Sequence, residues 1–334
     1  MQVLHETPDR PLSPIWSSPS WRAEATAWID QALASRGIRR TGEVEQTRVR
    51  AWSTQLRLQI DHGIAWMKAC SPTGADEAAV YDVLGARTPE LVLTPWATDA
   101  ARGWLLLPDG GPTLRDVATS STMLDQWAVV LHRYARLQRR AVDSEHDLLA
   151  AGLVRLTPED LVRQWRRRST PGDPLSGAEP VLQEAARVLQ EGPVPLSLQH
   201  DDVHTNNVFC AGSSVEEAEA ATFFDWGDSY IGHPFMSLLI ALRGPRYHFD
   251  ITMNDRERQR LIDAYLEPWT ELAPLTELRR LVAPAVLLGR VGRVLGWERS
   301  MSGATDEEWA EWRAHPEHWL SEVTELAASG ADVW

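Results

Sequence analysis

The spacing of apolar residues divides the chain into a first part that alternates and a second part with helical periods. Residues 21–36 repeat apolar side chains at helical spacing, and Gly37 follows as a helix stop. Apolar and polar residues then alternate in three segments: 43–50, 54–60 and 64–70. A turn at 61–63 joins the last two segments. The pattern predicts one helix followed by an antiparallel meander of three strands.

The remainder of the chain is mainly helical in pattern. Residues 75–84 return to helical spacing, and 103–107 form a short apolar run typical of a buried strand. Further helices are expected at 123–140, 161–168, 177–190 and over most of 235–328. Short strands are expected at 196–199, 207–210 and 222–225. This order predicts an α+β protein with a small β-rich lobe and a larger helical lobe. We expect the lobes at 1–107 and 113–334, with a hinge at 108–112.

Composition narrows the possible partners. The 334 residues suffice for two lobes with their own cores, and the formal net charge is -14. That charge argues against nucleic acid or an anionic membrane surface as partner, because both need a positive field. It would suit a cationic small molecule, although acidic surfaces also serve solubility. The oligomeric state is not indicated.

Cysteine usage and hydropathy exclude several other classes. Cys70 and Cys210 form no CxxC pair and lie in no metal-ligand cluster, so neither a disulfide framework nor a zinc site is indicated. No apolar run approaches the roughly 20 residues that span a bilayer. Residues 1–20 lack the apolar core of a signal peptide. We therefore expect a cytoplasmic location.

Two short segments carry the densest chemistry. Residues 200–207 read His-Asp-Asp-Val-His-Thr-Asn-Asn, and 223–228 read Phe-Phe-Asp-Trp-Gly-Asp. Phosphoryl transfer needs a carboxylate that orients and deprotonates the attacking hydroxyl, oxygen ligands for Mg²⁺, and cations on the phosphates. Asp202, on a loop between short strands, is a carboxylate that can meet such a hydroxyl. Asn207 and Asp225 carry the oxygen ligands that Mg²⁺ prefers.

In order and spacing, His-x-Asp-x-x-x-x-Asn followed by two apolar residues and Asp-Trp-Gly-Asp resembles the signature of aminoglycoside phosphotransferases and their choline-kinase-like relatives. The resemblance implies a bilobal, protein-kinase-like fold with ATP or GTP as phosphate donor. It implies that Asp202 is the catalytic base and that His200 supports the catalytic loop. It also implies that Asn207 and Asp225 hold Mg²⁺.

One step of the signature differs from the family. The usual Gly-Asp-Pro turn after the second motif is Gly-His-Pro here, with His233 in the place of the acid. The substitution leaves open which structural contact replaces that of the acid. The chemistry expected at Asp202 does not depend on it.

A lysine in the small lobe is consistent with the same resemblance. Lys68 lies inside an otherwise apolar strand, where an unpaired charge would be costly. Kinase-like folds place a lysine on the third strand to hold phosphates and pair it with a glutamate of the next helix. The resemblance therefore implies a pair between Lys68 and Glu77, with Asp76 as the alternative. Taken without the motif, Lys68 could also reach solvent from the end of the strand.

Two loops are expected to complete the nucleotide site. The turn 50–54 has no glycine, unlike the glycine-rich loop of protein kinases, and aminoglycoside phosphotransferases also lack the full pattern. Ser53 and its backbone N–H could reach a β-phosphate, or the loop could be an ordinary polar turn. The resemblance implies that adenine binds the backbone of the hinge, from Leu107 to Asp109.

Tryptophan is unusually common, with 16 residues against five tyrosines and five phenylalanines. Most are expected in the core or between lobes. Three lie in an acidic C-terminal region: Trp309, Trp312 and Trp319. Three glutamates follow Trp312: Glu317, Glu322 and Glu325. In relatives, acids of this region line the acceptor pocket, and an aromatic, acidic pocket would favour an ammonium group. The spacing of the tryptophans also fits one helical face that packs inward, the interpretation we favour for them.

These features predict a phosphotransferase that moves the γ-phosphate of ATP to a hydroxyl of a small molecule. Sugars, amino sugars, amino alcohols and aminoglycosides are candidate acceptors, and fold-level similarity does not choose among them. A nucleotide-binding pseudokinase with a regulatory role is the alternative, and it would have lost the base or the metal ligands that this chain retains. An unusual protein kinase would need an activation segment ending in Ala-Pro-Glu, which nothing after Asp225 resembles.

Overall fold

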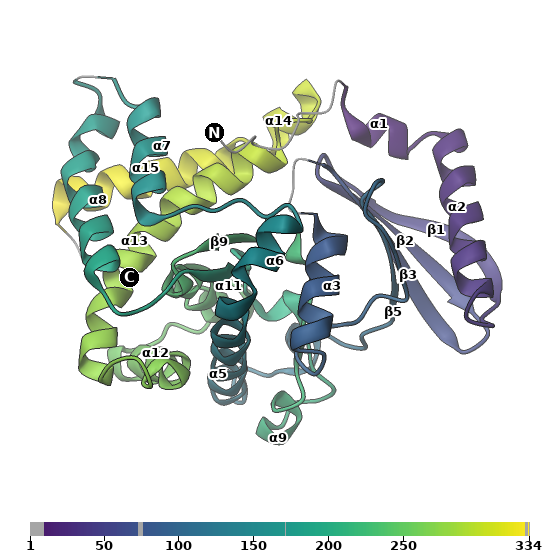
Figure 1. Cartoon of the computed structure of the whole chain (residues 1–334), viewed down its shortest axis with the longest axis horizontal. Helices are drawn as coiled ribbons and strands as arrows, with labels where there is room; N and C mark the ends of the chain where they lie inside the picture. Colours follow the sequence, from purple (N-terminus) through teal and green to yellow (C-terminus); the bar gives the residue numbers. More distant parts are fainter. Residues whose placement is uncertain (1–9, 73–75, 171, 331–332, 334) are drawn as a thin grey trace.

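A computed structural model describes residues 10–72, 76–170, 172–330 and 333. The segment 1–9 and Ala75, the expected first residue of one helix, lie outside the described residues. A small lobe built on a sheet and a larger helical lobe lie side by side (Figure 1). The two-lobed α+β architecture that the resemblance implied is therefore confirmed.

The small lobe contains one antiparallel sheet in the strand order β1-β2-β3-β5-β4. Its strands are β1 (Arg40–Val49), β2 (Ser53–Ile60), β3 (Gly63–Cys70), β4 (Ala97–Asp99) and β5 (Trp104–Pro108). The predicted meander is correct, and Gly63, with φ of 129°, closes the turn between β2 and β3. The pattern gave no sign of β4, because three half-buried residues are too few to alternate visibly.

Two helices flank this sheet on opposite sides, and a short third one precedes them. They are α2 (Pro19–Ala34) and α3 (Glu77–Arg87), preceded by α1 (Leu12–Trp16). Ser18 caps α2 by accepting a hydrogen bond from the Trp21 N–H, and Pro19 follows at the first helical position. The apolar side of α2 packs on the outer face of the sheet, with Ile29 and Leu56 fully buried between them. On the other face, α3 lies toward the large lobe (Figure 1).

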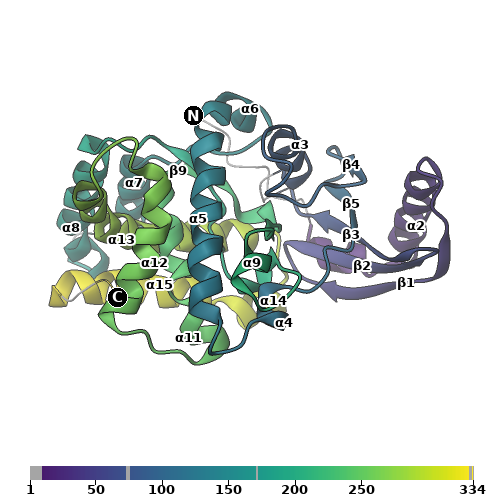
Figure 2. The same cartoon turned by 90° about the horizontal axis from the view of Figure 1, so that it is seen from below.

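The large lobe is mostly helical. Its longer helices are α5 (Met123–Ala141), α7 (Pro158–Arg168), α8 (Pro174–Glu191), α12 (Asp255–Leu266), α13 (Leu275–Ser300) and α15 (Ala314–Ser329). Shorter helices are α4 (Leu114–Val117), α6 (Glu145–Ala150), α9 (Val215–Ala218), α10 (Leu238–Ala241), α11 (Gly244–Phe249) and α14 (Asp306–Trp312). Seen from below, α5 runs through the middle of this lobe (Figure 2). No helix in the described ranges is both long and apolar enough to cross a membrane.

Two small antiparallel pairs of strands lie beside α5. They are β6 (Ser197–Gln199) with β9 (Tyr230–Gly232), and β7 (Val208–Phe209) with β8 (Thr222–Phe223). Buried polar groups of α5 hold the end of β6: Gln138 donates to the Leu198 carbonyl at 2.7 Å, and the Tyr134 hydroxyl accepts from the His200 N–H at 3.0 Å. The loops that follow β6 and β8 contain the two motif segments, and α5 therefore fixes where the first of them begins.

The three C-terminal tryptophans do not share one helical face. The helix ends at Trp312 and a new one begins at Ala314, so the expected single stripe is wrong. Trp319 is buried, with the Arg243 guanidinium 4.8 Å from its ring centre, which agrees with the packing interpretation. Trp309 is 40% exposed, and half-buried Trp312 packs toward the space between the lobes.

His233, the residue that replaces the usual acid, caps a short helix. Its Nδ1 accepts a hydrogen bond from the Phe235 N–H at 3.3 Å, at the start of a 3₁₀ turn, Pro234–Ser237. The imidazole thus supplies an acceptor where the family has a carboxylate. Its Nε2 is buried without a partner among the described residues, and burial lowers the pKa of His233 to about 3.

Replacing His233 by asparagine tests this burial. The unfolded chain binds a proton at a pKa of about 6.5, while the folded chain resists it down to about 3, so stability falls as the pH drops below about 6.5. Between pH 7 and pH 5 this side chain should remove about 2 kcal/mol from the free energy of unfolding. His233→Asn keeps an acceptor for the Phe235 N–H. Its free energy of unfolding should therefore fall by about 2 kcal/mol less than that of the wild type over the same pH range. Urea unfolding at several pH values in this range measures the free energy of unfolding of both proteins. An equal loss of stability between pH 7 and pH 5 in the two proteins would contradict the prediction.

Candidate active site

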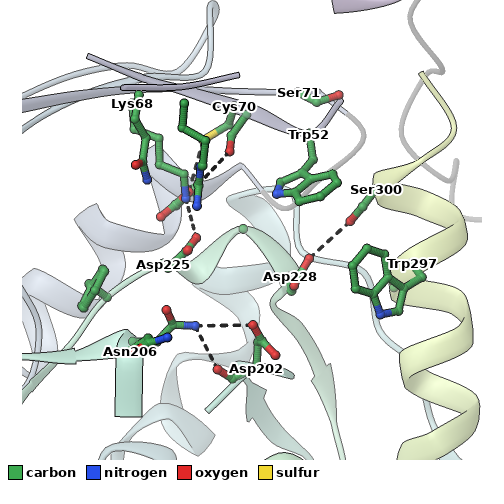
Figure 3. A pocket seen from close by; sticks show the side chains of 18 of the residues that line it. Trp52, Lys68, Cys70, Ser71, Asp202, Asn206, Asp225, Asp228, Trp297 and Ser300 are labelled. Carbon is green, nitrogen blue, oxygen red and sulfur yellow. Dashed lines mark hydrogen bonds and ion pairs between the residues drawn. The ribbon is translucent and has the colours of Figure 1, made fainter. Parts of the chain in front are cut away.

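A lysine at the centre of the molecule contacts two carboxylates from different elements. Lys68, on β3, places its Nζ 2.6 Å from the Glu77 Oε2 on α3 and 2.5 Å from the Asp225 Oδ1 that follows β8 (Figure 3). Lys68 is 7% exposed and Glu77 2%. The expected partner Glu77 is therefore in contact with Lys68, whereas Asp76 caps α3 by accepting from the Ala79 N–H.

Lys68 and Asp225 hold each other in their charged forms. Burial by itself would lower the pKa of Lys68, but Asp225 and Glu77 raise it well above its ordinary value. Burial would raise the pKa of Asp225, and the ammonium of Lys68 lowers it below the ordinary value instead. An ammonium and an ionised Asp225 therefore coexist at neutral pH.

The same glutamate positions the second motif segment. The Trp226 N–H donates to the Glu77 Oε1 at 3.1 Å, and the Asp225 N–H donates to the Tyr81 hydroxyl at 3.3 Å. Asp225 has a φ of 67°, a left-handed conformation that aspartate tolerates better than most residues. His200 lies below this turn, with its Nε2 2.8 Å from the Phe224 carbonyl oxygen. The His200 side chain thus joins the two motif segments through the Phe224 carbonyl, and it is fully buried.

Asp202 lies on the loop after β6 and is held by two basic side chains. Its Oδ2 is 3.2 Å from the His204 Nε2, and its Oδ1 is 3.3 Å from a terminal nitrogen of Arg293. Burial would raise its pKa, but Arg293 and His204 hold the pKa of this carboxyl well below its usual range. Asp202 is therefore a carboxylate with 27% of its side chain open to the cavity.

Asn207 and Asp225 offer oxygen atoms to a hard cation. The Asn207 Nδ2 donates to the Asp202 carbonyl at 3.0 Å, and its Oδ1 makes no hydrogen bond within the described residues. Asp225 bonds Lys68 through one carboxylate oxygen. Mg²⁺ prefers such amide and carboxylate oxygens, and it usually keeps waters and binds substrate phosphates as well. The described residues contain no group of three His, Cys, Asp or Glu side chains able to hold a metal, so phosphate and water would supply the other ligands.

Two cavities meet at Lys68. The larger, of about 470 Å³, is lined by the predicted residues Ser53, Lys68, Asp202, Asn207 and Asp225. The smaller, of about 250 Å³, is more apolar and is lined by the predicted residues Leu107, Asp109, Lys68 and Glu77. Stacked rings of Phe209 and Phe224, with centres 4.0 Å apart, form part of its wall. Of the predicted site residues, His200 alone lines neither cavity.

Sequence reasoning missed Arg293, which compensates the acids beside the proposed base. Its guanidinium lies 3.5 Å from Asp201, 3.3 Å from Asp202 and 3.9 Å from Asp228, and the residue is 8% exposed. It also donates to the Asp201 backbone carbonyl at 2.9 Å. Burial raises the pKa of Asp201 to about 6.

Glycines around Arg293 were a signal that could have been used. A Cβ on Gly292 would lie 2.8 Å from the Tyr230 hydroxyl, and one on Gly296 would lie 3.3 Å from an Asp201 carboxylate oxygen. Glycine inside a helix costs about 1 kcal/mol relative to alanine, so its repetition indicates close approach of another segment. The Gly-x-x-x-Gly spacing on α13 therefore indicates where this helix meets the catalytic loop.

Aromatic rings close one side of the larger cavity. Trp52, on the turn between β1 and β2, packs edge-on against Trp297 of α13 and Trp312 of α14, with ring centres 5.8 and 5.3 Å apart. Trp297 stacks on Trp312 and on His315. In Figure 3, Trp52 lies above Asp228 and Trp297 lies beside it. Residues of both lobes thus form this wall.

The C-terminal acids do not reach this cavity. None of the three glutamates named from the sequence, Glu317, Glu322 and Glu325, is among its lining residues. Glu322 instead pairs with Arg243 at 2.6 Å and Arg290 at 2.8 Å. These three glutamates therefore lie outside this cavity, and Asp228 is the acid that lies beside the aromatic wall.

Known proteins share both sequence pattern and fold with the chain. The pattern of the phosphotransferase enzyme family (APH) matches residues 69–275, more than half of the chain. No curated protein sequence matches significantly. A choline kinase from Streptococcus pneumoniae is 10% identical, with a TM-score of 0.64 over 92% of this chain and 99% of its own.

Two further solved structures are similar in fold. Aminoglycoside 2'-phosphotransferase-IIIa in complex with GDP is 13% identical, with a TM-score of 0.59 over 91% of this chain and 98% of its own. Macrolide 2'-phosphotransferase type I is 15% identical, with a TM-score of 0.55 over 87% of this chain and 96% of its own. With the family pattern over most of the catalytic lobe, the chain belongs to the phosphotransferase enzyme family and is a phosphotransferase that acts on an alcohol group, as the resemblance of its motifs implied.

Proposed function

We propose that the chain transfers the γ-phosphate of ATP or GTP to a hydroxyl of a small molecule, with Asp202 as the base. The observation that carries this proposal is the placement of Asp202 in the same cavity as Lys68, Asn207 and Asp225. Base, phosphate-binding cation and metal-binding oxygens thus face one space of about 470 Å³, which phosphoryl transfer requires.

The nucleotide would span both cavities. Its base fits the smaller, apolar one beside Leu107 and Asp109, where the backbone of a hinge at 108–112 would meet the purine edge. Its phosphates fit the larger one beside Lys68 and Ser53. Solved structures of similar fold include complexes with ADP and with GDP, which supports nucleotide binding at such a site.

Asn207 and Asp225 would hold Mg²⁺, which, when bound, neutralises charge on the phosphates. The Asn207 Nδ2 bond to the Asp202 carbonyl turns the amide oxygen of Asn207 away from the loop and leaves it free. Lys68 orients Asp225 through one carboxylate oxygen. The two side chains are therefore positioned before any ligand arrives.

The low pKa of Asp202 defines its role. A carboxylate held ionised by Arg293 and His204 is a weak proton acceptor, so it would mainly orient the hydroxyl and take its proton late. This suits phosphoryl transfer, because its transition state is loose and gains more from positioning than from early deprotonation. Asp202 would also exclude a competing water from the attacking position.

The acceptor would lie between Asp202 and the aromatic wall. Trp297, Trp52 and Asp228 line this end of the cavity, and aromatic faces beside a carboxylate favour an organic cation. The pKa of Asp228 is raised by burial, although Arg293 opposes this, so an acceptor amine would stabilise its ionised form. An amino sugar or amino alcohol fits this chemistry better than a neutral sugar.

Asp202→Asn should lower kcat by about 10²- to 10⁴-fold, because the amide cannot accept the proton of the attacking hydroxyl. The KM for ATP should stay within a few-fold of the wild-type value. Coupled-assay kinetics with a panel of amino alcohols, amino sugars and aminoglycosides measure both. Asp61→Asn, in the turn between β2 and β3, is the matched control. Wild-type protein that binds ATP but phosphorylates none of these acceptors would overturn the proposal and favour a pseudokinase.

Asp225→Asn should raise the Mg²⁺ concentration needed for half-maximal activity by at least about 10-fold, because a neutral amide is a weaker ligand for a hard cation. The loss of one partner of Lys68 also predicts a lower melting temperature. Glu77→Gln serves as comparison, since it removes the other partner of Lys68 and no proposed metal ligand. An unchanged Mg²⁺ dependence in Asp225→Asn would contradict the assignment.

Trp297→Leu should raise the acceptor KM by about 5- to 30-fold for a cationic acceptor and leave the ATP KM unchanged, because an indole face contributes roughly 1–2 kcal/mol to binding a desolvated cation. Trp309→Leu is the matched control, since Trp309 is exposed and lines neither cavity. Steady-state kinetics with the best acceptor of the panel provide the measurement. Equal effects of the two substitutions would place the acceptor elsewhere.

A further inference from the structure

The charges around Lys68 are unfavourable for a phosphate ligand. One ammonium lies between two carboxylates, Glu77 and Asp225, so this buried group has a net negative charge. A nucleoside triphosphate carries several negative charges, which such a group repels. A cation at Asn207 and Asp225 would compensate part of this charge. A further positive side chain, not already neutralised by an acid, is needed nearby.

Arg48 on β1 meets this description. It lines the larger cavity with Lys68 and Ser53, and it forms no ion pair with a carboxylate within the described residues. Its Nε is buried without a hydrogen-bond partner there, and one terminal nitrogen donates weakly to the Ser53 Oγ at 3.3 Å. A buried donor without a partner is costly, so a ligand that engages this guanidinium from the cavity would offset part of that cost.

Strand register places Arg48 in line with the central lysine. Arg48 lies opposite Gln55, and Gln55 lies opposite Lys68 on the next strand. Side chains of directly opposed residues point to the same face of a sheet, about 5 Å apart. Arg48, Gln55 and Lys68 therefore form a polar row across β1, β2 and β3, and all three line the cavity.

The other arginines of β1 and β2 form ion pairs with carboxylates. Arg40 lies 2.8 Å from Asp30, and Arg57 lies 3.8 Å from Glu45. Neither lines the larger or the smaller cavity. Among these three arginines, Arg48 alone lines the cavity and alone has no carboxylate partner within the described residues. An arginine that served only solubility would gain nothing from this position.

We propose that Arg48 is a phosphate-binding residue, whose guanidinium binds the terminal phosphates of the nucleotide beside Lys68. This inference rests on the proposed function, because it assumes that a nucleoside triphosphate occupies the cavity. A guanidinium presents several N–H donors in a plane and binds phosphate oxygens through two of them at once. Ser53, at the other end of the same contact, would orient the guanidinium.

Arg48→Met keeps most of the aliphatic stem and removes the charge. Its affinity for ATP should fall by about 10- to 100-fold, as expected for lost hydrogen bonds between charged groups. The loss should shrink from ATP to ADP to AMP and vanish for adenosine, because adenosine has no phosphate. Arg48→Lys should recover part of the ATP affinity, since it restores the charge without the planar fork. Isothermal titration calorimetry of the full chain with Mg²⁺ measures all four ligands.

Two controls separate this role from a structural one. Arg57→Met removes a guanidinium from the same sheet outside the cavities and should leave ATP affinity unchanged. The second control is adenosine, which should bind wild-type protein and Arg48→Met equally. A loss equal for ATP and adenosine, or a loss of ATP affinity as large in Arg57→Met, would overturn the proposal by showing that Arg48 holds the loop or the fold.

The outcomes also distinguish this inference from the proposed function. Wild-type protein that binds ATP with an affinity unaffected by Arg48→Met overturns the role of Arg48 and leaves the phosphotransferase proposal standing. Wild-type protein that binds neither ATP, GTP nor adenosine overturns nucleotide-dependent transfer and, with it, the role of Arg48.

Discussion

The burial of one ammonium group constrains the geometry of the whole cleft. Lys68 is 7% exposed, and a buried ammonium is tolerated only where carboxylates compensate its charge. Its partners come from α3 and from the loop after β8, so the sheet, the helix and the large lobe must meet at one point. The left-handed turn at Asp225 and the hydrogen bond that the Trp226 N–H donates to Glu77 hold the second motif segment at this point.

A second buried cation performs the same task deeper in the cleft. Arg293 of α13 compensates three aspartates, among them the proposed base Asp202, and its nitrogens fix the loop by bonding the Asp201 carbonyl. The two cations lie at different ends of the site: Lys68 at the end proposed for the nucleotide and Arg293 at the end proposed for the acceptor. Both ends are thus preorganised by contacts that the chain makes with itself, which lowers the reorganisation required during phosphate transfer.

The sequence predicted the parts of this site that depend on local pattern. The meander, the long α5 and the loops with Asp202 and Asp225 follow from periodicity and spacing, and the Lys68–Glu77 pair follows from the resemblance. Arg293 was not predictable in the same way, because it lies some ninety residues from Asp202 along the chain and no local pattern links them. Arg48 was missed for a related reason: an arginine on an alternating strand is common, and only the register with Gln55 and Lys68 shows which cavity it lines.

The two ends of the proposed site come from different parts of the chain. The residues proposed for transfer lie on β3, α3 and the two motif loops, and most of them contact one another directly. The proposed acceptor wall comes from the turn at Trp52 and from α13 and α14, whose rings pack on one another. Substitutions in the wall can therefore change which molecule is bound without disturbing the ion pairs at Lys68. Trp52 is the exception, because it adjoins Ser53, so a ligand that orders this turn at the phosphates also positions one ring of the acceptor wall.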